Sequence, residues 1–159
     1  MKKFHLILEE GDLAGLPKSF LEAAAETAES KGEKGKWAVT FDYPSYVPFM
    51  QYSERRDLRE KLYRAKSALC FNDSETSNKD VVKKIVNLRH QRAKLLGFKT
   101  HADYILAERM AETPETVFSF LSEITDKASG FAKKEVQELQ GFANKNGHEG
   151  DLQRWDLAF

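Results

Sequence analysis

The stretch that decides the fold class covers residues 113–147 and reads TPETVFSFLSEITDKASGFAKKEVQELQGFANKNG. Thr113-Pro114 is typical of a helix start, because proline fits the first helical turn, and Asn146-Gly147 is typical of a stop. Between these signals apolar residues recur at a mostly helical spacing: Val117, Leu121, Ile124, Ala128, Phe131, Leu139 and Phe142. The stretch therefore predicts one long amphipathic helix.

A basic helix is predicted earlier in the chain. Residues 72–78 are polar and predict a loop, and Ser77 with Asp80 fits a capping box at the start of the helix. Gly97 is expected to end it. Residues 79–99 hold seven lysines and arginines against one acidic residue.

A second capping box, Thr100 with Asp103, predicts another helix that ends near Ala111. Residues 100–126 hold six acidic residues against Arg109. This acidic stretch and the basic helix before it would attract each other if they pack antiparallel.

The region before residue 72 is predicted to be helical from about Ser45 to Phe71. Residues 42–45, Asp-Tyr-Pro-Ser, are typical of a turn, and Pro48 is tolerable only in the first turn of a helix. A break is expected near Tyr52, because Ser53 can restart a helix.

The start of the chain predicts a strand-helix-strand unit over residues 4–41. Residues 4–8 and 36–41 are rich in strand formers. Between them Pro17 suits the first turn of a helix that runs to about Ser30 and stops at Gly32.

The fold class is therefore mainly α with a small β element, in which a helical scaffold follows the strand-helix-strand unit. We divide residues 1–159 into that unit (4–41), a helical region (45–147) and an extended tail (148–159). The tail ends on apolar residues, which are Trp155, Leu157, Ala158 and Phe159. Because chain ends are usually polar and frayed, we expect the chain to be one segment cut from a larger protein.

Composition excludes several classes of protein. Of the 159 residues, 41% are hydrophobic and 31% are charged, which is a globular composition. No apolar run is long enough to span a membrane, and 25 basic residues balance 25 acidic ones, which disfavours a general polyanion binder. The single cysteine, Cys70, excludes a disulfide framework and, with the absence of a signal sequence, favours the cytoplasm.

The histidines do not predict a metal site. They are His5, His90, His101 and His148, and no two are four residues apart on one helix, as a His-Glu-x-x-His zinc motif requires. His90 and His101 are on consecutive predicted helices and could meet. We interpret them as exposed helix histidines.

The sequence also gives little evidence for a catalytic nucleophile, an acid–base pair or a phosphate-binding loop. Cys70 is interpreted as a buried structural thiol at a helix end, and no Gly-x-Ser-x-Gly nucleophile motif is present. Glu108 and Glu112 are one helical turn apart and could shift each other's pKa, but acids at this spacing usually form a solvated face. Gly32 and Gly35 have no phosphate-loop context.

Nucleic-acid binding is also disfavoured. The basic helix 79–99 has an apolar face, and no aromatic residues alternate with its charges to stack on bases. The aromatic residues of the region before it are expected to be core, and these are Tyr43, Tyr46, Phe49, Tyr52 and Tyr63.

Several short strings together are distinctive. In chain order they are LAGLP (13–17), WAVTF (37–41), YVPFM (46–50), LREKLYRA (58–65), LRHQRAKLLGF (88–98), ADY (102–104), MAETPETV (110–117) and LQRWDLAF (152–159). In this order and spacing the chain, from about Phe4 onward, resembles the middle of the thimet-oligopeptidase-like family of zinc metallopeptidases. The resemblance is to its bacterial peptidyl-dipeptidase (dipeptidyl carboxypeptidase) and oligopeptidase A type.

The resemblance implies a mostly helical protein with a deep, narrow channel that admits short peptides. It also implies a zinc ion held by a His-Glu-x-x-His helix and a later Glu, with the motif's Glu polarising the attacking water. All of these elements would follow Phe159. No catalytic, cofactor-binding or metal-binding residue is therefore assigned within residues 1–159, and zinc is expected only in the full-length parent.

Three interpretations of function remain. The first is a non-catalytic scaffold and channel-wall segment of a zinc-dependent peptidyl-dipeptidase or oligopeptidase, inactive alone. The alternatives are a free-standing helical protein-binding module and an autonomous enzyme that uses Glu108, Glu112 or His90. The expected partners are short peptides in the full-length parent, with no nucleic acid and no membrane. A homodimer through exposed apolar surface is also expected of the segment.

Overall fold

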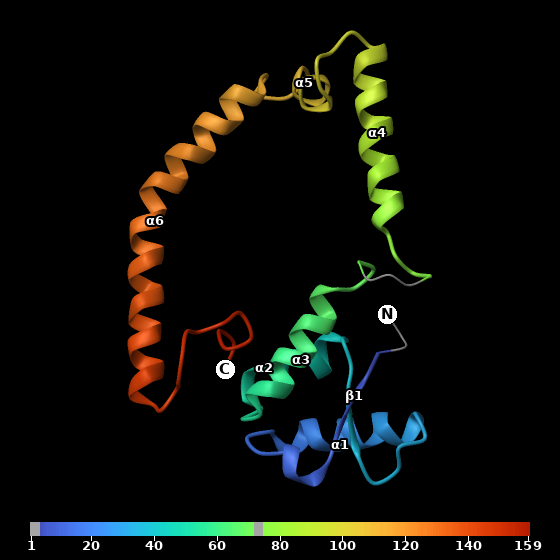
Figure 1. Ribbon diagram of the computed structural model, residues 1–159, viewed down its shortest axis with the longest axis vertical. Helices are drawn as coiled ribbons and strands as arrows, with labels where there is room; N and C mark the ends of the chain where they lie inside the picture. The colour runs from blue at the N-terminus through green and yellow to red at the C-terminus, as the bar shows by residue number, and fades with distance from the viewer. Residues whose placement is uncertain (1–3, 72–74) are drawn as a thin grey trace. The chain divides into compact units, whose positions relative to one another are not determined.

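The computed structural model describes residues 4–71 and 75–159, and these form two compact units (Figure 1). Unit 1 combines residues 1–72 with residues 151–159, and unit 2 spans residues 73–150. Within the described ranges, helices dominate and one two-stranded sheet is present. The predicted fold class, mainly α with a small β element, is confirmed.

The sheet of unit 1 joins β1 (Leu6–Leu8) to β2 (Trp37–Val39) in antiparallel register, with Leu6 opposite Val39 and Leu8 opposite Trp37. A short 3-10 helix, η1 (Glu10–Asp12), follows β1. Both predicted strands are therefore confirmed, although each is shorter than the sequence window that predicted it. The sheet is buried against the core because Leu8 and Val39 are fully enclosed.

The helix between the strands, α1 (Lys18–Ser30), packs against β2. Its buried positions are Phe20, Ala24 and Ala28, four residues apart, which is the spacing of one helical face. Pro17 stands at the N-cap, and Gly32 adopts a positive φ of 86° just after the helix. The predicted end of this helix is confirmed, and its first residue is one position later than predicted, because Pro17 lies at the N-cap and not in the first turn.

The predicted break near Tyr52 separates α2 (Tyr43–Tyr52) from α3 (Arg56–Ser67). The turn predicted at residues 42–45 is wrong, because Asp42 is the N-cap of α2 and Pro44 lies in its first turn. Since the helix begins earlier than expected, Pro48 lies in its second turn and not in its first.

The end of α3 also differs from the prediction. The helix stops at Ser67 instead of Phe71, and Cys70 adopts a left-handed φ of 59° in the turn that follows. Cys70 is half-buried, so it is neither at the helix end nor fully enclosed as expected.

The core of unit 1 lies between the sheet, α1, α2 and α3. Its most enclosed large side chains are Phe49, Leu8, Leu62 and Val39. Trp155, near the end of the chain, belongs to the same cluster and is 7% exposed. Residues 154–158 form turns, so this part of the predicted extended tail is folded and belongs to unit 1.

Unit 2 begins with α4 (Lys79–Leu95), whose N-cap is Asn78. The predicted Ser77 and Asp80 box is therefore wrong by one position, and the Asn78 side chain makes no capping hydrogen bond. Part of the predicted loop, residues 72–74, lies outside the described residues.

The predicted stop at Gly97 is confirmed. Gly97 has a φ of 84°, its N–H donates to the Lys94 carbonyl at 3.1 Å, and the Phe98 N–H donates to the Ala93 carbonyl at 2.9 Å. This pair of bonds is a Schellman motif, which satisfies carbonyls at the helix end.

The helix α5 (His101–Leu106) has the predicted capping box. The Asp103 N–H donates to the Thr100 hydroxyl at 3.3 Å, and the Thr100 N–H donates to the Asp103 carboxylate at 2.8 Å. The predicted end near Ala111 is wrong. Turns take over after Leu106, where the Arg109 N–H donates to the Leu106 carbonyl.

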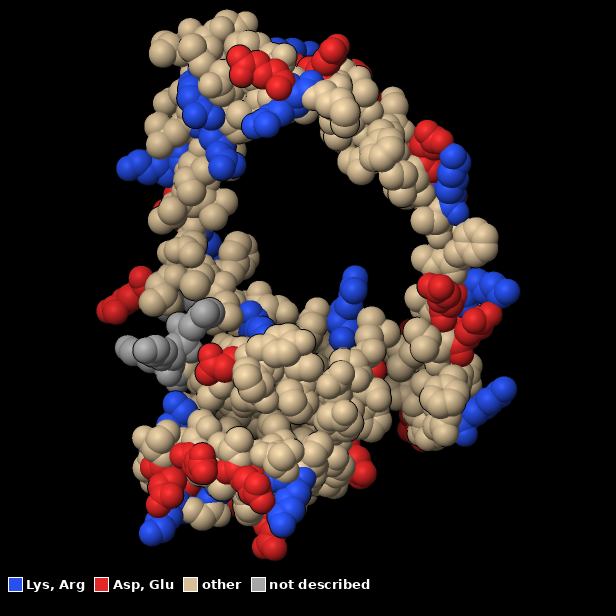
Figure 2. Space-filling view, turned by 180° about the vertical axis from the view of Figure 1, so that it is seen from behind, with Lys and Arg blue, Asp and Glu red and all other residues tan. Residues whose placement is uncertain are grey.

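The long helix α6 (Pro114–Lys145) begins and ends as predicted. The Thr116 N–H donates to the Thr113 hydroxyl at 3.2 Å, and Gly147 adopts a φ of 85° after the helix. Within unit 2, α5 packs against both α4 and α6. Many large apolar side chains of α4 and α6 are exposed, and Figure 2 shows uncharged surface between the charged groups of these helices.

Candidate functional site

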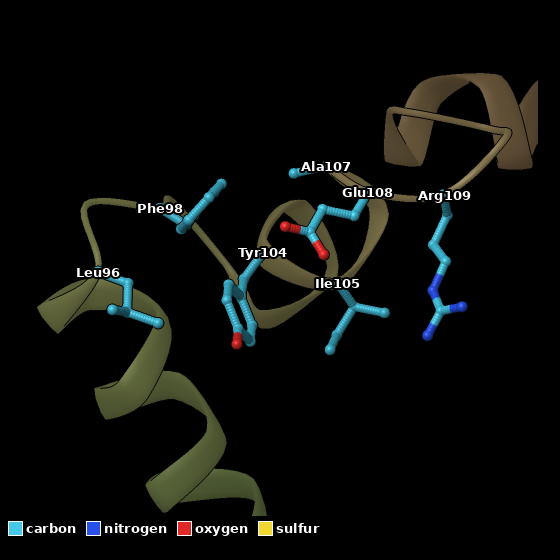
Figure 3. Close-up of a pocket in the computed structure, with 7 residues that line it drawn as sticks. All are labelled: Leu96, Phe98, Tyr104, Ile105, Ala107, Glu108 and Arg109. Carbon is cyan, nitrogen blue, oxygen red and sulfur yellow. The ribbon is translucent and has the colours of Figure 1, made fainter.

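A pocket of about 470 Å³ lies where α4 meets α5 (Figure 3). The end of α4 and the loop after it supply apolar groups from Leu96 and Phe98. On the other side Tyr104 and Ile105 project from α5, while Glu108 and Arg109 extend from the turns that follow. The pocket therefore combines apolar walls with one carboxylate and one guanidinium.

The pairing of Glu108 with Glu112 on one helical face is wrong. Because α5 ends at Leu106, neither residue is helical, and Glu112 has a left-handed φ of 59°. Only Glu108 lines the pocket. Both side chains are exposed, which agrees with a solvated role.

The histidines are dispersed. His101 lies beside Tyr104, with 6.3 Å between ring centroids, and Arg92 lies over the Tyr104 ring at 5.0 Å. Loss of hydration lowers the pKa of His101, and the nearby charges of Arg92 and Arg89 lower it further. An imidazole in this setting favours its neutral form.

Across the described residues, no group of three or more His, Cys, Asp and Glu side chains is placed to hold a metal ion. His101 Nδ1 and His148 Nε2 are buried without a hydrogen-bond partner, but within residues 4–71 and 75–159 neither histidine belongs to a group of three or more such side chains. The donor set of a zinc site, usually three or four close ligands, does not fit the residues described here.

The most connected polar cluster lies in unit 1, where residues 151–159, which we call the strap, contact α3. The Arg59 side chain donates to the Asp156 carboxylate at 3.1 Å, to the Trp155 carbonyl at 3.1 Å and to the Ser53 carbonyl at 2.5 Å. Arg56 donates to both carboxylate oxygens of Asp156, at 3.0 and 2.8 Å. The Arg59 and Asp156 side chains are each only 3% exposed.

Aromatic contacts surround this ion pair. The Trp155 ring lies 5.9 Å from the Tyr63 ring, and the Arg64 guanidinium lies over the Trp155 ring at 4.8 Å. The Arg59 guanidinium lies 4.1 Å from the centroid of the Phe159 ring. Guanidinium groups over aromatic faces add cation–π attraction.

Two opposing effects act on Asp156. Burial disfavours its charged form, but hydrogen bonds from Arg56, from the Gln153 N–H and from Arg59 outweigh burial, so the pKa of Asp156 lies below its ordinary value. A carboxylate with a lowered pKa in the folded state stabilises the fold above its unfolded pKa. That stabilisation is lost as the pH falls through the folded value.

We therefore expect the variant Asp156→Asn to be less stable than the unmodified chain at neutral pH, and this difference to shrink below about pH 4. Urea denaturation at a series of pH values, followed by circular dichroism, measures the difference. Asp151→Asn, an exposed acid of the same segment, is the matched control. A difference that stays constant down to about pH 2.5 would contradict this pKa assignment.

Comparison with known proteins identifies the family. Residues 49–159 match the family model described as Peptidase family M3. The chain belongs to this family. The resemblance to thimet-oligopeptidase-like metallopeptidases, predicted from the ordered strings, is therefore confirmed.

Individual relatives agree with the family assignment. The chain is 43% identical to Oligopeptidase A of Haemophilus influenzae over 158 residues, which cover 97% of the chain and 23% of that protein. It is 31% identical to Dipeptidyl carboxypeptidase of Escherichia coli, over 92% of the chain and 22% of that protein. The chain thus spans about a quarter of the length of these relatives.

Sequence reasoning missed the contact between α3 and the strap. Arg59 and Asp156 are 97 residues apart in the sequence. Capping and periodicity act over a few residues, so neither pattern could predict that these two side chains meet. A signal was available, because both residues fall within strings that carry the family resemblance, 58–65 and 152–159. Arg59 also lies between Leu58 and Leu62 on a face that is partly buried.

Proposed function

We propose that this M3-family chain is a scaffold and channel-wall segment of a zinc-dependent oligopeptidase or peptidyl-dipeptidase that hydrolyses short peptides. The observation that carries the proposal is the family match over residues 49–159 combined with coverage of only 23% of Oligopeptidase A. The names of the relatives, Oligopeptidase A and Dipeptidyl carboxypeptidase, support peptides as the substrate class.

The chemistry of the described residues supports a structural role. Among them no group of three or more His, Cys, Asp and Glu side chains could hold a metal ion, and Glu108 and Glu112 do not share a helical face. We assign the metal, the general base and the oxyanion donors to parts of the parent polypeptide other than residues 1–159. The segment contributes to the parent a folded unit in which α3, the sheet and the strap share one hydrophobic core.

The compartment is proposed to be the cytoplasm. A relative from Arabidopsis thaliana named Probable cytosolic oligopeptidase A is 35% identical over 99% of the chain, which supports this proposal. No helix among the described residues is long and apolar enough to cross a membrane. Dimerisation through exposed apolar surface stays a prediction, as does the alternative of a free-standing binding module.

We expect the 159-residue chain to show neither tight stoichiometric zinc binding nor cleavage of short peptides. Isothermal titration with Zn²⁺ and an assay with an internally quenched peptide measure these two properties. Haemophilus influenzae Oligopeptidase A, assayed in parallel, is the positive control. Binding of one zinc per chain together with chelator-sensitive cleavage would contradict the proposal and would direct attention to Glu108 and the histidines.

A further inference from the structure

The strap is the feature of the fold that carries an inference beyond the proposed function. Its polar contacts with α3 join residues nearly one hundred positions apart, as in the bonds from Arg56 and Arg59 to Asp156. All 78 residues of unit 2 lie between these partners in the chain. Unit 1 is therefore completed by a segment that follows unit 2 in the sequence.

The strap also has local structure of its own. The Gln153 N–H donates to the Asp156 carboxylate at 3.0 Å, and the Asp156 N–H donates to the Gln153 carbonyl at 2.9 Å. The Phe159 N–H donates to the Asp156 carbonyl at 3.3 Å. These bonds hold Trp155 and Asp156 in a turn, and such preorganisation reduces the entropy lost on binding.

The connection to unit 2 is a turn that contains two glycines. Gly147 and Gly150 both have φ values above 80°, and a Cβ added at either position would meet nothing within 4 Å. The Gly150 carbonyl accepts a hydrogen bond from Gln140 on α6, and the strap begins at the next residue. The residues that connect the strap to α6 are thus different from Trp155 and Asp156, which contact α3.

We infer that α3 carries a binding site for a Trp-Asp peptide segment and that the strap occupies this site as an intramolecular ligand. The site consists of Arg56 and Arg59, which hold the carboxylate, and Tyr63 and Arg64, which contact the indole. Two guanidinium groups that donate to one buried carboxylate select both its negative charge and its planar geometry. The same segment, supplied as a separate peptide, binds α3 once the covalently attached strap is disabled.

The test uses the full chain with its strap disabled by Trp155→Ala and Asp156→Asn together. A fluorescent synthetic peptide of residues 151–159 is titrated with this variant, and anisotropy reports binding. We expect saturable binding. The unmodified chain should bind the peptide at least about tenfold more weakly, because its own strap competes at a high effective concentration.

The matched control changes the peptide and leaves the protein unaltered. A peptide carrying Asp156→Asn should bind the disabled variant at least about tenfold more weakly, because it lacks the charge that the arginines hold. A full chain with Asp151→Asn should bind the peptide no better than the unmodified chain. No saturable binding by a folded variant, or equal binding of both peptides, would overturn the inference.

A second measurement on the unmodified chain applies even if the double variant does not fold. In native-state hydrogen exchange, the amides of Asp156 and Phe159 should be protected together with that of Leu62 on α3. Exchange of the strap amides at unprotected rates while Leu62 stays protected would equally overturn the inference.

Discussion

Replacement of Arg59 by methionine is expected to lower the free energy of unfolding of unit 1 by about 3–5 kcal/mol. The substitution removes the charge that pairs with Asp156, although Arg56 still contacts that carboxylate. It also leaves the Ser53 and Trp155 carbonyls without the hydrogen bonds that Arg59 donates. An unpaired buried polar group costs more than the net contribution of the bond that it loses.

Lys61→Met is the matched control, because Lys61 is an exposed cation on the same helix and undergoes the same chemical change. It is expected to change stability by about 0.5 kcal/mol or less. Urea denaturation followed by the fluorescence of Trp37 and Trp155 measures both variants. Equal stability of the two variants would show that the bonds from Arg59 to the strap and to Ser53 contribute nothing to folding.

Replacement of Gly15 by alanine is expected to destabilise unit 1 by about 2–5 kcal/mol. Gly15 has a φ of 81°, and an added Cβ would lie 2.1 Å from the Tyr52 carbonyl oxygen. The neighbouring Ala14 carbonyl accepts a hydrogen bond from the Glu54 N–H at 3.1 Å, so the loop cannot move away without breaking this contact. The loop before α1 and the break between α2 and α3 are therefore fitted to each other.

The variant Gly35→Ala separates the backbone strain of a positive φ from the steric clash of the added Cβ. Gly35 has nearly the same φ, 82°, but its Cβ would meet nothing within 4 Å. Its expected cost is only the backbone strain of about 1–2 kcal/mol. Thermal unfolding measured by circular dichroism compares the two variants, and an equal loss in both would mean that the predicted clash at Gly15 relaxes freely.

The helix ends of unit 2 show what local sequence can predict. The capping groups Thr100 and Thr113 and the stops at Gly97 and Gly147 are all confirmed, because a cap satisfies backbone groups within four residues of itself. The start of α4 was predicted one residue too early. Asn78, next to the predicted Ser77, is the N-cap of α4, and both residue types are common at that position.

The candidate site was less predictable than the helices. The acid pair Glu108 and Glu112 depended on a helix continuing to Ala111, and its early end at Leu106 removed the pairing. The segment after Leu106 is held by backbone hydrogen bonds, from the Arg109 N–H to the Leu106 carbonyl and from the Glu112 N–H to the Arg109 carbonyl. Backbone groups are the same for every residue type, so these bonds give no capping signal in the sequence.

The sequence by itself determined the fold class, most helix limits and, through the order of its short strings, membership of peptidase family M3. Periodicity and capping act over a few residues, so these features can be read along the chain. Only the tertiary structure decided that Arg59 and Asp156 are buried together and that residues 151–159 complete the core of unit 1. Two charged residues far apart in the sequence become one buried ion pair only when the fold brings them into contact and removes water from both.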